Sequence, residues 1–285
     1  MTGPVSVPRS LGDTIAALRD DPDATVLAGG TDLMVEVNSG RRRPGTVVAL
    51  TQVPELRGWR RDGDELVLGA CLTYAEMERG ELAALVPGLA QAARTVGSPQ
   101  IRNAATIGGN VGTASPAGDM LPVLAALDAT VETLGSDGAR RVPLLDLVVG
   151  VKRTSLLPGE IVTGIRVPAL RGPQEFLKVG TRTAMVISVV MVAVVVDLDG
   201  RTVRAGLGSV APVPVRARDA EAYAGEHVDW DEGHVDGLDV PTRFGELCGA
   251  ASSPIDDHRS TADYRRRAVA VCAARALDRA LGRPA

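Results

Sequence analysis

Val26-Leu27-Ala28-Gly29-Gly30-Thr31-Asp32-Leu33 is the stretch that decides the fold, because a short apolar strand here runs into two glycines and then into a helix. Two adjacent glycines let the backbone turn sharply, and no Cβ hinders the approach of a ligand. The start of the helix offers unpaired N–H groups and a partial positive charge, which suit a phosphate or diphosphate. The alternative is a plain tight turn in which Thr31 or Asp32 caps the helix. If an anion binds here, the Asp32 side chain should point away from it.

A second glycine pair lies in Thr106-Ile107-Gly108-Gly109-Asn110, within a Gly/Ser/Pro/Asn-rich stretch at residues 97–118. That stretch is too long for a plain connector, so we expect a functional loop. Successive N–H groups in such a turn form an anion-binding nest, although a glycine-rich loop without a ligand is the alternative. Two such turns in separate segments predict one diphosphate held between two lobes.

Of two further motifs, we keep the first as a candidate for cofactor binding and reject the second. Asp119, at the end of Ala114-Ser115-Pro116-Ala117-Gly118-Asp119, suits hydrogen bonding to ribose hydroxyls, although a turn-forming aspartate is the simpler explanation. Residues 206–211 match the GxGxxG/A pattern of dinucleotide sites, which requires a helix to open at once. Pro212 and Pro214 follow instead, so we reject this second motif.

The hydrophobic pattern on both sides of these motifs predicts alternating helices and strands. The predicted helices are residues 10–20, 32–38, 73–79, 82–96, 216–223, 242–251 and 262–281, the last one stopping at residues 282–284. The predicted strands are residues 25–28, 46–50, 65–68, 130–134, 160–167, 185–197 and 202–210. Asp197-Leu198-Asp199-Gly200 is a strong hairpin signal between the last two strands.

The composition limits the classes of function. The net charge of -4 argues against nucleic acid, and the arginine runs at 41–43 and 265–267 are expected to be solvated faces. The three cysteines, Cys71, Cys248 and Cys272, contain no CxxC pair, so no metal site or iron–sulfur cluster is expected in this chain. No signal peptide is visible, and the apolar run at 184–196 is too short to span a bilayer, so the cytoplasm is the default location.

No catalytic residue stands out either. The three histidines lack metal-ligand spacing, and no nucleophile motif is present. Any redox chemistry therefore requires a cofactor.

The motifs AGGTDL, QIRNAATIGGN and ASPAGD together resemble those of the FAD-binding medium subunit of the xanthine dehydrogenase and carbon monoxide dehydrogenase family, the molybdenum hydroxylases. GEIVTGIRVP, the F-x-K-V-G-x-R stretch at 176–182, GSVAPVPVRA and ADYRRRAVAV extend the resemblance over nearly the whole chain. It implies an α+β fold: a two-lobed FAD-binding domain of the PCMH or vanillyl-alcohol-oxidase type at 1–172, with lobes at about 1–52 and 53–172. A smaller α/β domain of the CO dehydrogenase flavoprotein type, at 173–285, would follow.

The resemblance also implies the site. The two glycine turns would grip the FAD diphosphate, Asp119 would contact the adenosine, Val162 would pack near the flavin or adenine, and Lys178 would reach the cofactor. Val96 stands where some relatives have an aromatic residue, which leaves the packing there open. The implied cofactor-binding residues are Val26, Leu27, Ala28, Gly29, Gly30, Thr31, Asp32, Leu33, Val96, Thr106, Ile107, Gly108, Gly109, Asn110, Asp119, Val162 and Lys178.

By the same resemblance, non-covalent FAD would take electrons from [2Fe-2S] clusters of a small subunit, which receive them from molybdopterin in a large subunit. NAD, oxygen or a quinone would accept them. Some family members carry a [4Fe-4S] cluster in this subunit, but three scattered cysteines argue against one here. The alternatives are a stand-alone FAD oxidoreductase of the same superfamily and a binding module that has lost its flavin.

Overall fold

The most apolar run of the chain forms the central strand, β12 (Ser188–Asp197), and all of its residues are buried. Met191, Ala193 and Val195 pack into one hydrophobic core, whereas the valines at 190, 192, 194 and 196 pack into a second one. Side chains of a strand point alternately to its two faces, so a strand that is covered on both faces is apolar throughout. The prediction of a buried strand is confirmed.

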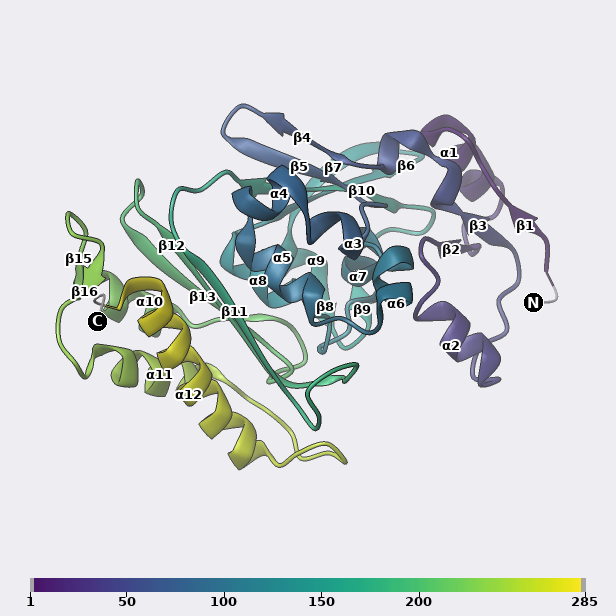
Figure 1. Ribbon diagram of the computed structural model, residues 1–285. Coiled ribbons are helices and arrows are strands. Elements are labelled where there is room, and N and C mark those ends of the chain that lie inside the picture. Colours follow the sequence, from purple (N-terminus) through teal and green to yellow (C-terminus); the bar gives the residue numbers. More distant parts are fainter. Residues whose placement is uncertain (1–2, 283–285) are drawn as a thin grey trace.

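β12 belongs to an antiparallel sheet of order β11 (Gln174–Gly180), β12, β13 (Thr202–Gly208), β14 (Val215–Arg216). Helices α10 (Arg218–Glu226) and α12 (Ala262–Leu281) cover one face, and α11 (Val240–Ala251) packs against both. The other face contacts α5 (Pro87–Arg94) and α8 (Met120–Ala126), as Figure 1 shows. The sheet therefore joins the C-terminal helices to the rest of the molecule.

The packing of α8 explains the glycines of the rejected GxGxxG-like segment. A Cβ on Gly206 would lie 1.9 Å from the carbonyl oxygen of Pro122, so only glycine lets α8 approach β13 this closely. No helix opens directly after the segment, because the chain first continues into β14. The sequence-based rejection is confirmed.

The middle of the chain forms a five-stranded antiparallel sheet of order β4-β5-β10-β6-β7, with short helices packed against it. Its strands are β4 (Trp59–Asp62), β5 (Glu65–Gly69), β6 (Thr130–Gly135), β7 (Gly138–Pro143) and β10 (Ile161–Pro168). The remaining elements of this lobe are α3 (Tyr74–Met77), α4 (Gly80–Leu85), α6 (Pro99–Ala104), α7 (Ile107–Thr113), α9 (Leu144–Leu147), β8 (Val148–Gly150) and β9 (Arg153–Thr154).

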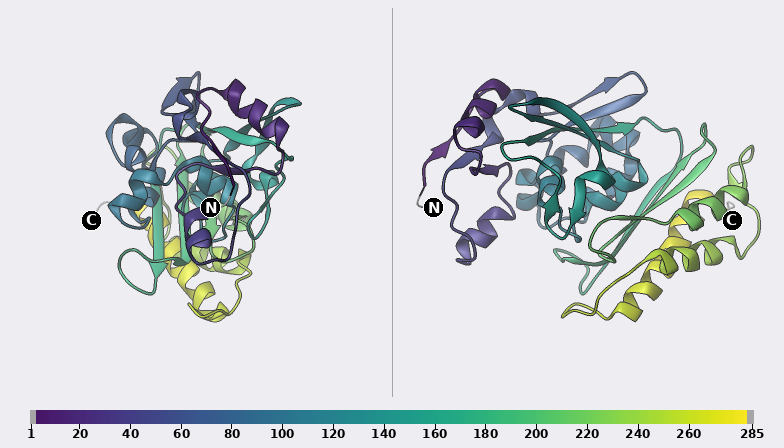
Figure 2. Two further views of the ribbon diagram at one scale, coloured as in Figure 1. Left: turned by 90° about the vertical axis from the view of Figure 1, so that its right-hand side faces the viewer. Right: turned by 180° about the vertical axis from the view of Figure 1, so that it is seen from behind.

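The first lobe is small. It holds a parallel sheet of order β1 (Val5–Ser6), β3 (Val47–Ala49), β2 (Thr25–Leu27), with α1 (Leu11–Asp20) and α2 (Leu33–Asn38). As predicted, the first helix begins after Ser10, whose side chain accepts a hydrogen bond from the Asp13 N–H. Figures 1 and 2 show an elongated molecule with this lobe at one end and the C-terminal helices at the other.

The structure describes residues 3–282. The predicted helix stop at 282–284 and the outer ends of the predicted domains therefore lie partly outside the described residues. The predicted boundary between 172 and 173 stays a prediction. Within the described residues, no helix is both long and apolar enough to cross a membrane.

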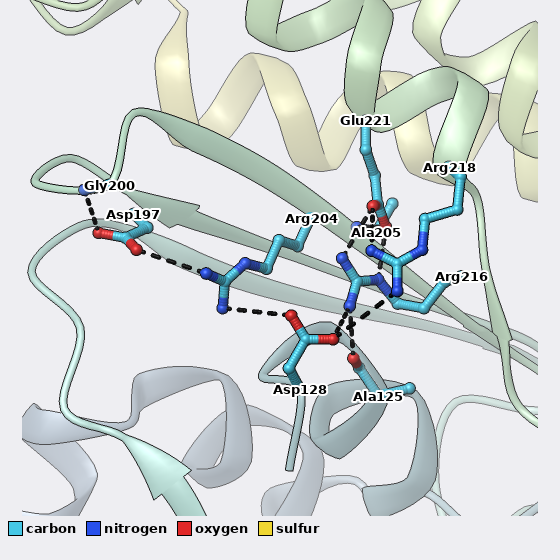
Figure 3. Close-up of polar contacts among 9 residues, drawn as sticks. All are labelled: Ala125, Asp128, Asp197, Gly200, Arg204, Ala205, Arg216, Arg218 and Glu221. Atoms are coloured by element: carbon cyan, nitrogen blue, oxygen red, sulfur yellow. Dashed lines mark hydrogen bonds and ion pairs between the residues drawn. The ribbon is translucent and has the colours of Figure 1, made fainter. Parts of the chain in front are cut away.

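A buried polar network fixes the junction between α8 and the four-stranded sheet (Figure 3). The Arg216 guanidinium donates to the Ala125 carbonyl oxygen, to Asp128 and, at 2.5 and 2.8 Å, to both oxygens of Glu221. Arg204 approaches Asp128 on one side and Asp197 on the other. A bidentate arginine–carboxylate pair is geometrically specific, so this network fixes the orientation of the sheet against α8.

Two predictions about the second lobe were wrong. Residues 82–96 form two helices, α4 and α5, because Pro87 has no N–H to donate and displaces Val86 from helical geometry (φ -133°). Residues 97–118 are not one long loop, because they contain α6 and α7, which are capped by the Ser98 and Thr106 hydroxyls.

The second arginine run was also misjudged. Arg265 is only 2% exposed and donates to the carbonyl oxygens of Val189 and Ser209 and to the carboxylate of Asp257. Arg266 and Arg267 are exposed. The run therefore starts with a structural cation, which ties α12 to the end of the sheet.

Candidate functional site

A cavity of about 540 Å³ lies between the first and second lobes. Its walls include the loop from β2 into α2, the stretch from α6 into α7, the residues that follow β5, and residues 156–162 at the start of β10. Both glycine pairs line it. Of the predicted site residues, the lining includes Val26, Leu27, Ala28, Gly29, Gly30, Thr31, Asp32, Leu33, Thr106, Gly108, Gly109, Asn110 and Val162.

The main chains of the two glycine-containing segments touch each other. A Cβ on Gly29 would lie 1.8 Å from the carbonyl oxygen of Ala104, just before the second motif. A Cβ on Gly108 would lie 2.6 Å from Ala70, at the end of β5. These two glycines therefore allow close packing between segments, which brings the two turns to one cavity.

The free hydrogen-bond donors come from the first turn. Within residues 3–282, the N–H groups of residues 29–32 have no protein acceptor. Gly30 has φ +72°, which a glycine adopts without strain. Four successive unpaired N–H groups beside a cavity are well suited to the oxygens of a diphosphate.

The second turn does not form the predicted nest of free donors, because it is the first turn of α7. The Gly108 N–H donates to the Ala70 carbonyl oxygen at 2.9 Å, and the Gly109 N–H donates to the Thr106 hydroxyl at 3.0 Å. The Asn110 N–H donates to the Thr106 carbonyl oxygen. This motif shapes the cavity instead of supplying main-chain donors.

α7 presents an almost bare face to the cavity. Gly108, Gly109, Gly112 and Thr113 line it at helical spacing, and a Cβ on Gly112 would meet no heavy atom within 4 Å. A ligand can therefore approach the backbone of this helix closely.

The side-chain oxygen of Asn110, at the same wall, has no hydrogen-bond donor among the described residues. The Oδ1 atom of Asn110 is buried and accepts no hydrogen bond from the described residues, whereas its amide contacts the hydroxyl of Tyr74. Burial raises the pKa of Tyr74, so its hydroxyl is neutral. A buried acceptor without a donor is costly, so a group that donates a hydrogen bond to Asn110 would be stabilising here.

Another part of the wall is apolar. Leu50, Leu156, Ile161 and Val162 offer a surface for a planar ring. Glu160 braces this wall, since it accepts hydrogen bonds from Thr133, Arg140 and the Leu157 N–H. Burial alone would raise the pKa of Glu160, but these donors outweigh it and hold the pKa at about 2.

Four predicted site residues do not line the cavity: Val96, Ile107, Asp119 and Lys178. Ile107 is a core residue. Lys178 of β11 pairs with Asp119 at 2.5 Å and donates to the Thr95 carbonyl oxygen. Burial raises the pKa of Asp119, although Lys178 and Thr95 stabilise its charged form. Their contact with a cofactor stays a prediction.

Sequence reasoning missed several polar residues of the lining, namely Thr25, Glu36, Arg42, Cys71, Tyr74 and Lys152. One compositional signal was available. The chain has 31 basic residues, of which only Lys152 and Lys178 are lysines. Among residues 3–282, no group of three or more His, Cys, Asp or Glu side chains is placed to hold a metal ion.

Two family models match the chain. Residues 2–170 match the FAD-binding domain in molybdopterin dehydrogenase, and residues 175–280 match the CO dehydrogenase flavoprotein C-terminal domain. The chain is 32% identical to the carbon monoxide dehydrogenase medium chain of Afipia carboxidovorans, over 97% of this chain and 96% of that one. It is also 32% identical to the xanthine dehydrogenase FAD-binding subunit of Escherichia coli O157:H7, over 75% of this chain and 76% of the relative.

Solved structures show the same fold. The CO dehydrogenase from Oligotropha carboxidovorans superimposes with a TM-score of 0.89 at 29% identity, over 98% of each chain. Quinoline 2-oxidoreductase from Pseudomonas putida 86 does so with a TM-score of 0.90 at 26% identity, over 98% of this chain and 97% of that one. The predicted two-domain α+β fold class is confirmed.

Proposed function

The chain belongs to the FAD-binding oxidoreductase subunits of the molybdenum hydroxylase family. From this premise we propose that it relays electrons from two partner subunits to a final acceptor. In this proposal a large molybdopterin subunit passes electrons to the [2Fe-2S] clusters of a small subunit. Those clusters then pass the electrons to the FAD of this chain. The electrons leave to NAD, oxygen or a quinone. The names of the relatives, medium chain and FAD-binding subunit, support a multi-subunit assembly.

The observation that carries the proposal is the meeting of both glycine turns at one cavity with free main-chain donors. FAD, when bound, supplies the redox chemistry. The N–H groups of residues 29–32 would bind the diphosphate, and the bare face of α7 would let it lie close to the backbone. Asn110 Oδ1 would accept a hydrogen bond from the cofactor, and Val162 and Ile161 would pack against one of its rings.

The residues of the chain position the cofactor and shield it from water. Buried Leu50, Ile161 and Val162 exclude solvent from one side of the cavity. Asp119 and Lys178, which pair with each other beside β11, are proposed as a second zone of cofactor contact.

The test starts with the purified chain. We expect a yellow protein whose spectrum shows flavin absorbance, and one FAD per chain released on denaturation. A colourless chain that takes up no FAD would overturn the proposal. Co-expression with neighbouring genes should give a complex with a smaller and a larger subunit. A flavoprotein that copurifies with neither and oxidises a substrate alone would instead be the stand-alone oxidoreductase.

A further inference from the structure

One ion pair crosses the cavity between the two lobes. The Nζ atom of Lys152, in the turn between β8 and β9, lies 2.6 Å from Oε1 of Glu36 in α2. Arg42 lies 3.8 Å from the other oxygen of Glu36 and donates to the hydroxyl of Thr25. All four residues line the cavity. Within the described residues, the Glu36–Lys152 pair is the one salt bridge that joins residues 3–52 to the rest of the chain.

The backbone of Lys152 is held in an unusual conformation. Its φ of +53° lies in the left-handed region, which a side chain with a Cβ seldom adopts. Its N–H donates at 2.9 Å to the carbonyl oxygen of Ala114, the left-handed residue that caps the end of α7. Glycine or asparagine would take this conformation more easily. The lysine side chain at this position therefore needs a reason beyond the turn itself.

The ion pair contributes little to the stability of the fold. The side chains of Lys152 and Glu36 are 51% and 28% exposed, and exposed pairs of this kind stabilise proteins only weakly. The hydrogen bond from Lys152, followed by its charge and that of Arg42, lowers the pKa of Glu36, so the carboxylate stays charged at neutral pH. What distinguishes the pair is its position across the cavity.

We propose that Glu36 and Lys152, with Arg42 as a second cation, form a clasp that retains the dinucleotide cofactor in the cavity. The Gly29–Ala104 contact and the clasp are two separate links between the same two lobes, and both border the cavity. The clasp is the link that can open, because it consists of exposed side chains, whereas the other link is packed main chain. This inference rests on the proposed FAD site and adds the residues that govern exchange of the cofactor.

The first test measures how fast FAD leaves. Lys152→Ala and Glu36→Gln should each speed FAD dissociation by about twofold to fivefold, the upper part of the range that corresponds to loss of an exposed ion pair. Arg153→Ala is the matched control, because Arg153 is the exposed next residue, at the start of β9, and does not line the cavity. Dissociation from the unmodified chain should accelerate with salt, whereas dissociation from Lys152→Ala should respond weakly.

A charge exchange separates the ion pair from other effects of the two positions. Lys152→Glu places two carboxylates together and should release FAD faster than Lys152→Ala does. Combining it with Glu36→Lys restores an opposite-charge pair and should bring the rate back toward that of the unmodified chain. No recovery in the double variant would contradict the clasp.

The second test uses the scarcity of lysine. Lys178 is buried, with 5% side-chain exposure, so an amine-reactive reagent should label Lys152 as the one accessible lysine of the chain. Saturating FAD should slow the labelling of Lys152, as read by peptide mass spectrometry. Equal labelling rates with and without FAD would overturn the proposal.

The outcomes distinguish the two proposals. If the unmodified chain binds no FAD, the proposed function fails and the clasp fails with it. If the unmodified chain binds FAD and all variants release it at the same rate, only the clasp is overturned.

Discussion

Replacing Gly112 by alanine should stabilise the protein and weaken FAD binding at the same time. Gly112 lies inside α7 on the face that lines the cavity, and its added Cβ would meet no heavy atom within 4 Å. The methyl group therefore fits the protein itself, and it projects into the space proposed for the cofactor.

The two effects have different sizes. Alanine in place of glycine within a helix stabilises by about 1 kcal/mol, which raises the Tm of a chain this large by roughly 3 °C. A methyl group forced against a bound ligand costs about 1–2 kcal/mol, so the Kd for FAD should rise roughly fivefold to thirtyfold. Tm must be measured on FAD-free protein, because bound ligand itself stabilises the native state.

Gly225 offers a matched control. It lies within α10, and its added Cβ would also meet no heavy atom within 4 Å, but it does not line the cavity. Gly225→Ala should raise Tm by the same few degrees and leave the Kd unchanged. Flavin fluorescence titration measures the Kd, and differential scanning calorimetry measures the Tm. Unchanged FAD affinity in Gly112→Ala would refute the reasoning, because the cofactor could then not lie against α7.

Three further outcomes are expected. Gly29→Ala should yield protein without flavin, as read from absorbance per chain, because its Cβ would lie 1.8 Å from the Ala104 carbonyl oxygen and force the lobes apart. Arg216→Ala should lower the free energy of unfolding by about 3 kcal/mol in denaturant titrations, because the buried Glu221 carboxylate loses its bidentate partner and keeps only the Ala205 N–H and the exposed Arg218. Glu160 has a pKa of about 2, below its ordinary 4.5, so its stabilising contribution is full above about pH 4.5 and declines toward pH 2. The free energy of unfolding of Glu160→Gln should therefore depend less on pH in that range than that of the unmodified chain. An equally steep dependence would contradict the low pKa of Glu160.

Much of the element pattern and the meeting of the two glycine turns at one cavity could be predicted from the sequence. Helix and strand periodicity placed α12 at 262–281 and identified β12 as a buried strand, because both signals are local. The helix-breaking signal of Pro87 is equally local, and it indicates two helices where the periodicity predicts one at 82–96. The motif at 106–110 was read as a loop because its glycines disfavour a helix, but the Thr106 cap and the packing of α7 outweigh that preference.

Other features depend on partners far away in the sequence. Arg265 is a structural cation because Val189, Ser209 and Asp257 surround it, and nothing within its own run of arginines indicates this. Lys152 contacts a carboxylate 116 residues earlier in the chain, so no local pattern predicted its place at the cavity. Charge alone suggests a solvated side chain in both cases, and only the tertiary structure reverses or refines that interpretation.

In both glycine pairs the first and the second glycine have the same separate roles, although the pairs lie in different lobes. In each pair the first glycine packs against the main chain of another segment: Gly29 against Ala104, and Gly108 against Ala70. The second glycine serves the cavity: Gly30 turns the chain at φ +72° beside the free N–H groups, and Gly109 keeps α7 bare. Adjacent glycines are therefore required for two separate reasons, close packing between segments and access to the backbone at the cavity. This explains how a pair whose N–H groups are already bonded within the protein, as in α7, still lines the proposed cofactor site.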